Sequence, residues 1–171
     1  MRPARRRREP RAAARHGRPG VRVQVQRRVR SWSPTRRELA RWASVAAGSA
    51  AGRRELGVCV VAAPESRRLN ARFRGRDAPT NVLSFSSVAL PAAPARGARI
   101  LGELVICPRV LRAEARAQDK SLRAHWAHLV VHGTLHLLGY EHERAADARR
   151  MERREIAVLK RLGFANPYRS G

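Results

Sequence analysis

The chain has 171 residues, of which 43% are hydrophobic, and this is enough for one compact domain with its own core. Basic residues number 37 against 13 acidic ones, and the net charge of +24 disfavours a cationic partner and favours a polyanion such as RNA, DNA or an anionic membrane. All but two of the basic residues are arginines, a bias that a GC-rich genome also produces. No apolar run approaches the roughly 18 residues of a membrane span. Among the possible polyanions we therefore expect RNA and no membrane as the partner.

The folded domain is expected over 21–168, after an arginine-rich segment. Residues 1–20 contain eight arginines and one acid, so they cannot bury apolar surface and are predicted to form a disordered arm. Three interpretations are open: an arm that contacts RNA, an extension under weak selection, and an organelle transit peptide. The last is weakened because transit peptides are rich in serine and residues 1–20 contain none. The expected location is the cytoplasm, with an organelle as the alternative if the arm is a transit peptide.

Strands and helices are mixed along the rest of the chain. Alternating valines predict a half-buried strand over 21–29. The helix that follows begins with a capping-box pattern of Thr35 and Glu38 and ends at Gly48. This order predicts an α+β fold, with a small mixed four-stranded sheet packed against about five helices. The further elements, in chain order, are a central strand, a short helix, two more strands and three helices: 55–63, 65–73, 80–85, 99–107, 108–118, 122–138 and 144–162.

The cysteines do not offer a metal site, but one helix carries several histidines. Cys59 and Cys107 each lie alone in an apolar strand, and because the chain has no CxxC pair we expect two buried free thiols. The helix over 122–138, capped by Ser121, is apolar on most sides and is therefore predicted to lie buried in the middle of the fold.

The histidine spacing in this central helix is the strongest functional signal of the sequence. His132 and His136 are four residues apart, so their rings project from one helix face about one turn apart and can bind one metal ion. Gly139 permits the backbone turn that ends the helix, after which His142 can supply a third ligand. Three imidazoles with one open position describe a catalytic zinc site rather than a closed structural one.

Two further histidines and one glycine limit this interpretation. His125 and His128 lie on roughly the same face, and we expect His125 near solvent and His128 as a hydrogen-bonding residue behind the ligands or in the core. The spacing matches the long zinc motif of metzincin proteases, in which the residue after the first histidine is the general base, a glutamate. Gly133 occupies that position here, so the metal geometry is expected without the peptidase chemistry.

The sequence resembles the YbeY family of metal-dependent single-strand endoribonucleases over about residues 20–168. The resemblance rests on HGTLHLLGYEH (132–142), LNARFRGRDAPTNVLSF (69–85) and LGELVI (101–106). It implies an α+β fold, a functional arginine at Arg74, and one zinc ion per chain on three histidines: His132, His136 and His142. It also implies processing of ribosomal RNA, notably at the 3′ end of the small-subunit RNA, and ribosome quality control. Ribosomal proteins and a ribosome-assembly GTPase are the further implied partners.

Several assignments stay open at this stage. From composition alone Arg74 is one solvated arginine among many, whereas beside a metal it would hold a phosphodiester and offset its charge. The general base is unassigned between Glu141, where the family commonly has aspartate, and Glu103 in an apolar strand. The rival functions are a zinc-stabilised ribosome assembly factor without catalysis, a metallopeptidase-like hydrolase, and RNA chaperoning by the basic arm.

Overall fold

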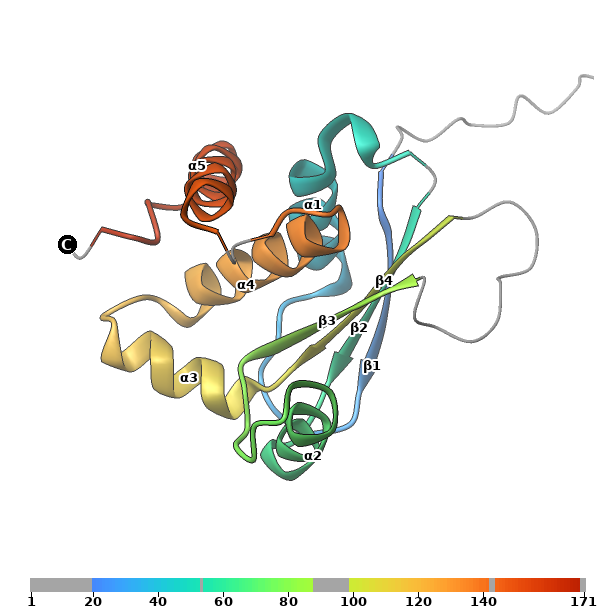
Figure 1. The fold of residues 1–171 in the computed structure, drawn as a ribbon, viewed down its shortest axis with the longest axis vertical. Helices are drawn as coiled ribbons and strands as arrows, with labels where there is room; N and C mark the ends of the chain where they lie inside the picture. The colour runs from blue at the N-terminus through green and yellow to red at the C-terminus, as the bar shows by residue number, and fades with distance from the viewer. Residues whose placement is uncertain (1–19, 53, 88–98, 142–143, 170–171) are drawn as a thin grey trace, which may run out of the picture.

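The computed structural model describes residues 20–52, 54–87, 99–141 and 144–169 (Figure 1). Except for Gly20, the arm predicted at 1–20 lies outside these residues. The elements are, in chain order, β1 (Arg22–Arg27), α1 (Arg36–Ala47), a short 3-10 turn (Gly48–Ala50), β2 (Arg54–Val60), α2 (Ala63–Arg74), β3 (Val82–Ser86), β4 (Arg99–Ile106), α3 (Pro108–Ala117), α4 (Leu122–Leu137) and α5 (Ala145–Leu162).

The four strands form one mixed sheet in the order β1-β2-β4-β3. Strands β1, β2 and β4 run parallel, and β3 is antiparallel to β4 at the edge. The apolar strand β2 is central, as its continuous hydrophobic run predicted. The sheet and the five α-helices of the described residues confirm the predicted α+β fold. None of these helices is long and apolar enough to cross a lipid bilayer.

The two faces of the sheet bury cores of different size. The larger core lies between the sheet and helices α1, α4 and α5, and it includes the fully buried Trp42, Trp126 and Leu104 (Figure 1). The smaller core lies on the other face, where Leu69 of α2 packs against strand side chains such as Cys59. Both predicted free thiols are buried.

Local sequence signals explain where the helices begin and end. At α1 the backbone N–H of Glu38 donates to Thr35 Oγ1 at 3.3 Å, and the backbone N–H of Thr35 donates to Glu38 Oε2 at 2.9 Å, which confirms the predicted capping box. Ser121 caps α4 by accepting from the backbone of Ala124. Gly163 ends α5 with a φ of +86°, in the left-handed region that glycine adopts without strain.

Helix α4 packs closely on the sheet because its middle turn carries a glycine. A Cβ atom at Gly133 would lie 2.6 Å from Leu104 Cδ2 and 3.1 Å from Ser84 Oγ, so no side chain fits between α4 and strands β3 and β4. The glutamate that a metzincin carries at this position would therefore clash with the sheet. This contact brings the backbone beside His132 against the sheet.

Candidate metal centre

Two of the three predicted metal ligands meet on α4. His132 Nε2 and His136 Nε2 lie 3.2 Å apart, and the two rings stand nearly perpendicular with their centroids 4.6 Å apart. The four-residue spacing of a helix places both side chains on one face, as the sequence predicted. The third predicted ligand, His142, lies outside the described residues, so its place in the site stays a prediction.

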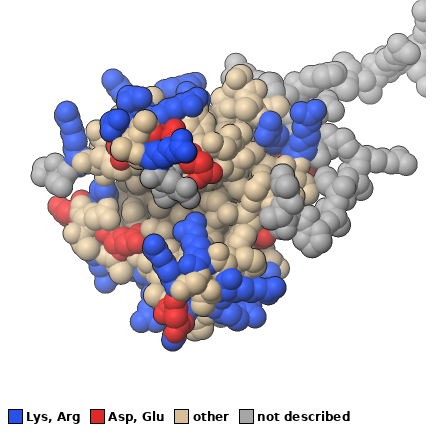
Figure 2. Space-filling view, viewed as in Figure 1, with Lys and Arg blue, Asp and Glu red and all other residues tan. Residues whose placement is uncertain are grey.

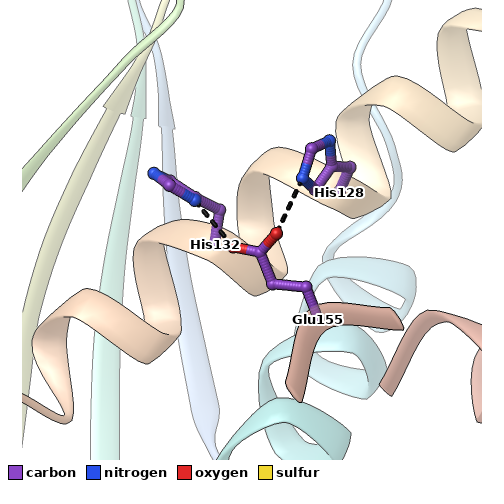
Figure 3. Close-up of side chains that lie close together, drawn as sticks. All are labelled: His128, His132 and Glu155. Atoms are coloured by element: carbon purple, nitrogen blue, oxygen red, sulfur yellow. Dashed lines mark hydrogen bonds and ion pairs between the residues drawn. The ribbon is translucent and has the colours of Figure 1, made fainter. Parts of the chain in front are cut away.

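A buried glutamate on α5 contacts two of the histidines on α4. The Glu155 side chain is 0% exposed, and its Oε1 lies 2.7 Å from His132 Nδ1 while its Oε2 lies 3.0 Å from His128 Nε2 (Figure 3). The hydroxyl of Tyr168, from the segment after α5, donates to the same Oε2. Three side chains from two parts of the chain thus converge on one carboxylate.

The surroundings of Glu155 keep it ionised. Burial raises the pKa of this carboxyl, but the hydrogen bonds from His128, His132 and Tyr168 outweigh burial and lower it to about 2. An ionised carboxylate only accepts hydrogen bonds, so the nitrogens that face it carry protons. In the neutral imidazole of His132, Nδ1 is then the donor and Nε2, which faces His136, is the unprotonated nitrogen that a metal requires.

Sequence reasoning missed Glu155. It lies in the apolar stripe of α5 formed by Met151, Val158 and Leu162, and all four residues are buried. A carboxylate at a core position of an amphipathic helix is itself a signal, because a buried charge needs partners. The sequence did not show which residues those partners are, since α4 and the Tyr168 segment approach only in the folded chain.

The structure separates the roles of the two other histidines on α4. The expectation that His125 lies near solvent is wrong: its side chain is 4% exposed, and Nε2 lies 2.7 Å from Glu114 Oε2. Helix α3 covers the start of α4 and supplies this carboxylate, which also accepts from the amide of Asn81. His128 behaves as expected, because it bonds to the carboxylate behind His132.

Two overlapping sets of atoms could hold a metal ion. The ligand atoms of His128, His132 and Glu155 all lie within 4.8 Å of one another, an arrangement consistent with the expected metal cofactor. In the second set, the Nε2 atoms of His132 and His136 face each other at 3.2 Å. Two nitrogens bound to one tetrahedral zinc at 2.0–2.1 Å would stand about 3.3 Å apart, so the second set also fits.

Three further predicted site residues lie on other parts of the fold. Glu141 Oε2 is 3.9 Å from His136 Nδ1, so this exposed acid lies beside the cluster. Glu103 lies in β4 opposite Phe85 of β3. Because side chains alternate along a strand, the Glu103 side chain lies on the face of the sheet opposite Leu104 and α4. Arg74 is the last residue of α2, exposed, and makes no hydrogen bond or ion pair with any described residue. The structure therefore places Glu141 beside the histidines and turns Glu103 to the other face of the sheet, while the role of Arg74 stays a prediction.

Comparisons with known proteins identify the family. The family model described as Endoribonuclease YbeY matches residues 24–163. An Endoribonuclease YbeY of Halorhodospira halophila is 54% identical over 114 residues, covering 67% of this chain and 74% of that protein. An Endoribonuclease YbeY of Alkalilimnicola ehrlichii is 49% identical over 155 residues, covering 88% of this chain and 93% of that protein.

A solved structure agrees with the fold. The solution structure of a Thermotoga maritima protein matches with a TM-score of 0.50 at 22% identity, covering 87% of this chain and 99% of that one. The names of the two sequence relatives confirm the expected classification as a hydrolytic nuclease. With one family model spanning most of the described domain, the chain belongs to the Endoribonuclease YbeY family.

Proposed function

We propose that this chain is a zinc-dependent endoribonuclease that cuts single-stranded RNA during ribosomal RNA maturation, at the 3′ end of the small-subunit RNA, and in ribosome quality control. The observation that carries the metal-dependent part is the facing pair of His132 and His136 nitrogens with Glu155 behind it. Family membership and the net charge of +24 support RNA as the substrate. The ribosomal role rests on the family resemblance, as do the proposed cytoplasmic location, ribosomal proteins and assembly GTPase.

One zinc ion would be held by His132, His136 and His142. The ionised Glu155 supports this assignment, because a carboxylate on Nδ1 of a ligand histidine directs its Nε2 to the metal. A zinc ion there would polarise the phosphodiester and lower the pKa of water at its open position. Both oxygens of Glu155 already accept hydrogen bonds from ring nitrogens, so we assign this residue as the partner that orients His132 and not as a ligand.

The protein's own side chains would bind and orient the RNA around this site. Arg74 is exposed and has no acidic partner among the described residues, so its guanidinium is available to a phosphate oxygen. Glu141 lies at the rim beside His136 and is the better placed of the two predicted bases to accept a proton from an attacking group. Gly133 leaves no base at the metzincin position, which argues against peptidase chemistry.

The test is zinc content and single-stranded RNA cleavage on the same preparations of wild type, His136→Ala and His128→Gln. We expect about one zinc per chain in the wild type, with both zinc and cleavage lost in His136→Ala. In His128→Gln zinc should remain, bound about 10- to 100-fold more weakly, as for other residues behind metal ligands. Zinc retained in His136→Ala and lost in His128→Gln would overturn the ligand assignment. Stoichiometric zinc without cleavage would favour a metal-stabilised assembly factor.

A further inference from the structure

A cleft of about 510 Å³ lies beyond the C-terminal ends of the parallel strands, and no α4 histidine lines it. It forms where the parallel strands β2 and β4 end and helices α2 and α3 begin, with residues 29–31 after β1 as a further wall (Figure 1). None of its described lining residues is acidic, and four of them are arginines: Arg30, Arg109, Arg112 and Arg116. The cleft therefore presents a concentrated positive charge away from the metal centre.

No described acidic residue pairs with the four arginines of this cleft. Two arginines on neighbouring elements are paired: Arg67 lies 2.5 Å from Asp77, and Arg28 lies 2.5 Å from Glu65. The four cleft arginines make no ion pair with any described residue, although acidic groups are interspersed with basic ones elsewhere on the surface (Figure 2). Unpaired charges held close together repel one another, so an anion that enters the cleft relieves this repulsion.

The spacing of the arginines matches a chain of phosphates better than a single small anion. The three on α3 occupy positions i, i+3 and i+7 and thus follow one face of the helix for two turns, which is about 10 Å. Arg30 approaches this row from the loop after β1, where Ser31 Oγ lies 3.5 Å from Arg112 Nη2. A row of guanidiniums suits a flexible polyanion that follows the helix.

An exposed tryptophan lies next to the cleft in sequence. Trp32 follows the lining residue Ser31 and is 48% exposed, whereas the two other tryptophans, Trp42 and Trp126, are buried in the core. Proteins that bind single-stranded nucleic acid combine a basic groove with aromatic rings on which bases stack. An acidic peptide needs only the charge, so the exposed indole favours RNA over an acidic peptide.

We propose that this cleft is a second RNA-binding surface, in which the four arginines bind the backbone phosphates of single-stranded RNA and Trp32 stacks on a base. The proposal rests on the proposed function in that the bound strand is the substrate, or a neighbouring part of it, that the histidine site cuts. RNA long enough to reach both places would bind more tightly than RNA that reaches the histidines alone.

The position of Trp32 provides a direct assay. Because Trp42 and Trp126 are 1% and 0% exposed, quenching of tryptophan fluorescence on adding RNA reports on Trp32. We would titrate the full chain with a 12-nucleotide polyuridine at 4 °C and several salt concentrations, and check by gel that the RNA stays intact. The test variant is Arg109→Ala/Arg112→Ala/Arg116→Ala. The matched control removes the same charge from three exposed arginines of α5: Arg149→Ala/Arg153→Ala/Arg161→Ala.

In the wild type we expect saturable quenching. In the α3 variant the Kd should rise about tenfold or more, and the slope of log Kd against log salt should fall by about 2, as the loss of three phosphate contacts to a single strand requires. The α5 control should change the Kd by less than about threefold. Equal weakening in both variants, unquenched Trp32, or quenching by phosphatidylserine vesicles or polyglutamate but not by RNA would overturn the proposal.

Cleavage kinetics separate this proposal from the proposed function. If both are right, the α3 variant has a raised KM on 12-nucleotide RNA and an unchanged kcat, because the histidine site is intact. If the chain binds RNA in the cleft but does not cut it, the fluorescence result persists while the wild type shows no cleavage. If it cuts RNA with the same KM in the wild type and the α3 variant, the cleft proposal fails and the proposed function stands.

Discussion

His132 Nδ1 lies 2.7 Å from Glu155 Oε1, so a carboxylate on α5 fixes the proton and the orientation of a ring on α4. The two helices are joined by a segment that contains the predicted third ligand, His142. The packing of α5 against α4 is thus part of the metal centre as well as of the core. This relationship turns a histidine spacing that occurs by chance in many helices into a candidate zinc site.

Glu155→Gln is expected to weaken zinc binding by about 10- to 100-fold, because the amide no longer fixes the proton of His132 on Nδ1. The affinity is measured by competition with a chromophoric chelator. Glu114→Gln is the matched control, since it changes a carboxylate that faces His125 on the same helix without touching the proposed ligands. Equal zinc affinities in Glu155→Gln and the wild type would remove the orienting role of Glu155.

Tyr168→Phe removes the hydroxyl that donates to Glu155 and leaves the ring in place. A hydrogen bond to a charged, buried group contributes about 1.5–3 kcal/mol, so the free energy of unfolding should fall by about that amount. Urea denaturation measures the change. Tyr140→Phe serves as the control, because the Tyr140 hydroxyl makes no hydrogen bond with any described residue. A loss in Tyr140→Phe as large as that in Tyr168→Phe would contradict the prediction.

The hydrogen bonds that Glu114 accepts from His125 and Asn81 predict a pH dependence of stability. Burial raises the pKa of Glu114, but hydrogen bonds from His125 and Asn81 outweigh it and hold the pKa below the usual value of 4.5. The folded state therefore binds this proton more weakly than the unfolded state. The stabilisation is complete above about pH 5 and is lost as the pH falls through the lowered folded pKa.

The measurement for these hydrogen bonds is the Tm of wild type and Glu114→Gln between about pH 6 and pH 3. The wild type should lose stability more steeply than the variant over this range, so the Tm difference between them should shrink towards low pH. Asn81→Ala, which removes one of the two donors, should have an intermediate slope. Parallel curves for wild type and Glu114→Gln would show that the carboxylate does not contribute.

Gly133→Ala should destabilise the domain by about 1–3 kcal/mol, because the added Cβ would lie 2.6 Å from Leu104 Cδ2. The neighbouring side chain can be shortened to test the cause. In Gly133→Ala/Leu104→Val the two changes should be less destabilising than the sum of the single variants, and urea denaturation of all four proteins gives the coupling. Additive effects would mean that the contact between α4 and β4 is not what requires glycine.

The elements predicted from sequence are those whose signals are local. The Thr35 and Glu38 capping box and Ser121 at the start of α4 each act within a few residues, and each is found where the sequence placed it. The apolar run of β2 likewise predicted its central position. Such features need no knowledge of what the chain packs against.

The parts that sequence reasoning missed depend on contacts between distant elements. His125 was expected near solvent, but it is buried against Glu114 of α3, a partner that the sequence did not reveal. Glu155 was missed although it is an acid among core positions of α5, because its partners His128 and His132 lie on another helix. The identity of a buried polar network follows from tertiary packing, which a single sequence does not specify.

The most direct test of the account is the position of the zinc ion in a crystal structure of the zinc-loaded full chain, located by anomalous scattering at the zinc edge. The account predicts one peak within about 2.1 Å of the Nε2 atoms of both His132 and His136, with Glu155 still bonded to His132 Nδ1. A peak among His128, His132 Nδ1 and Glu155, with His136 unligated, would contradict it.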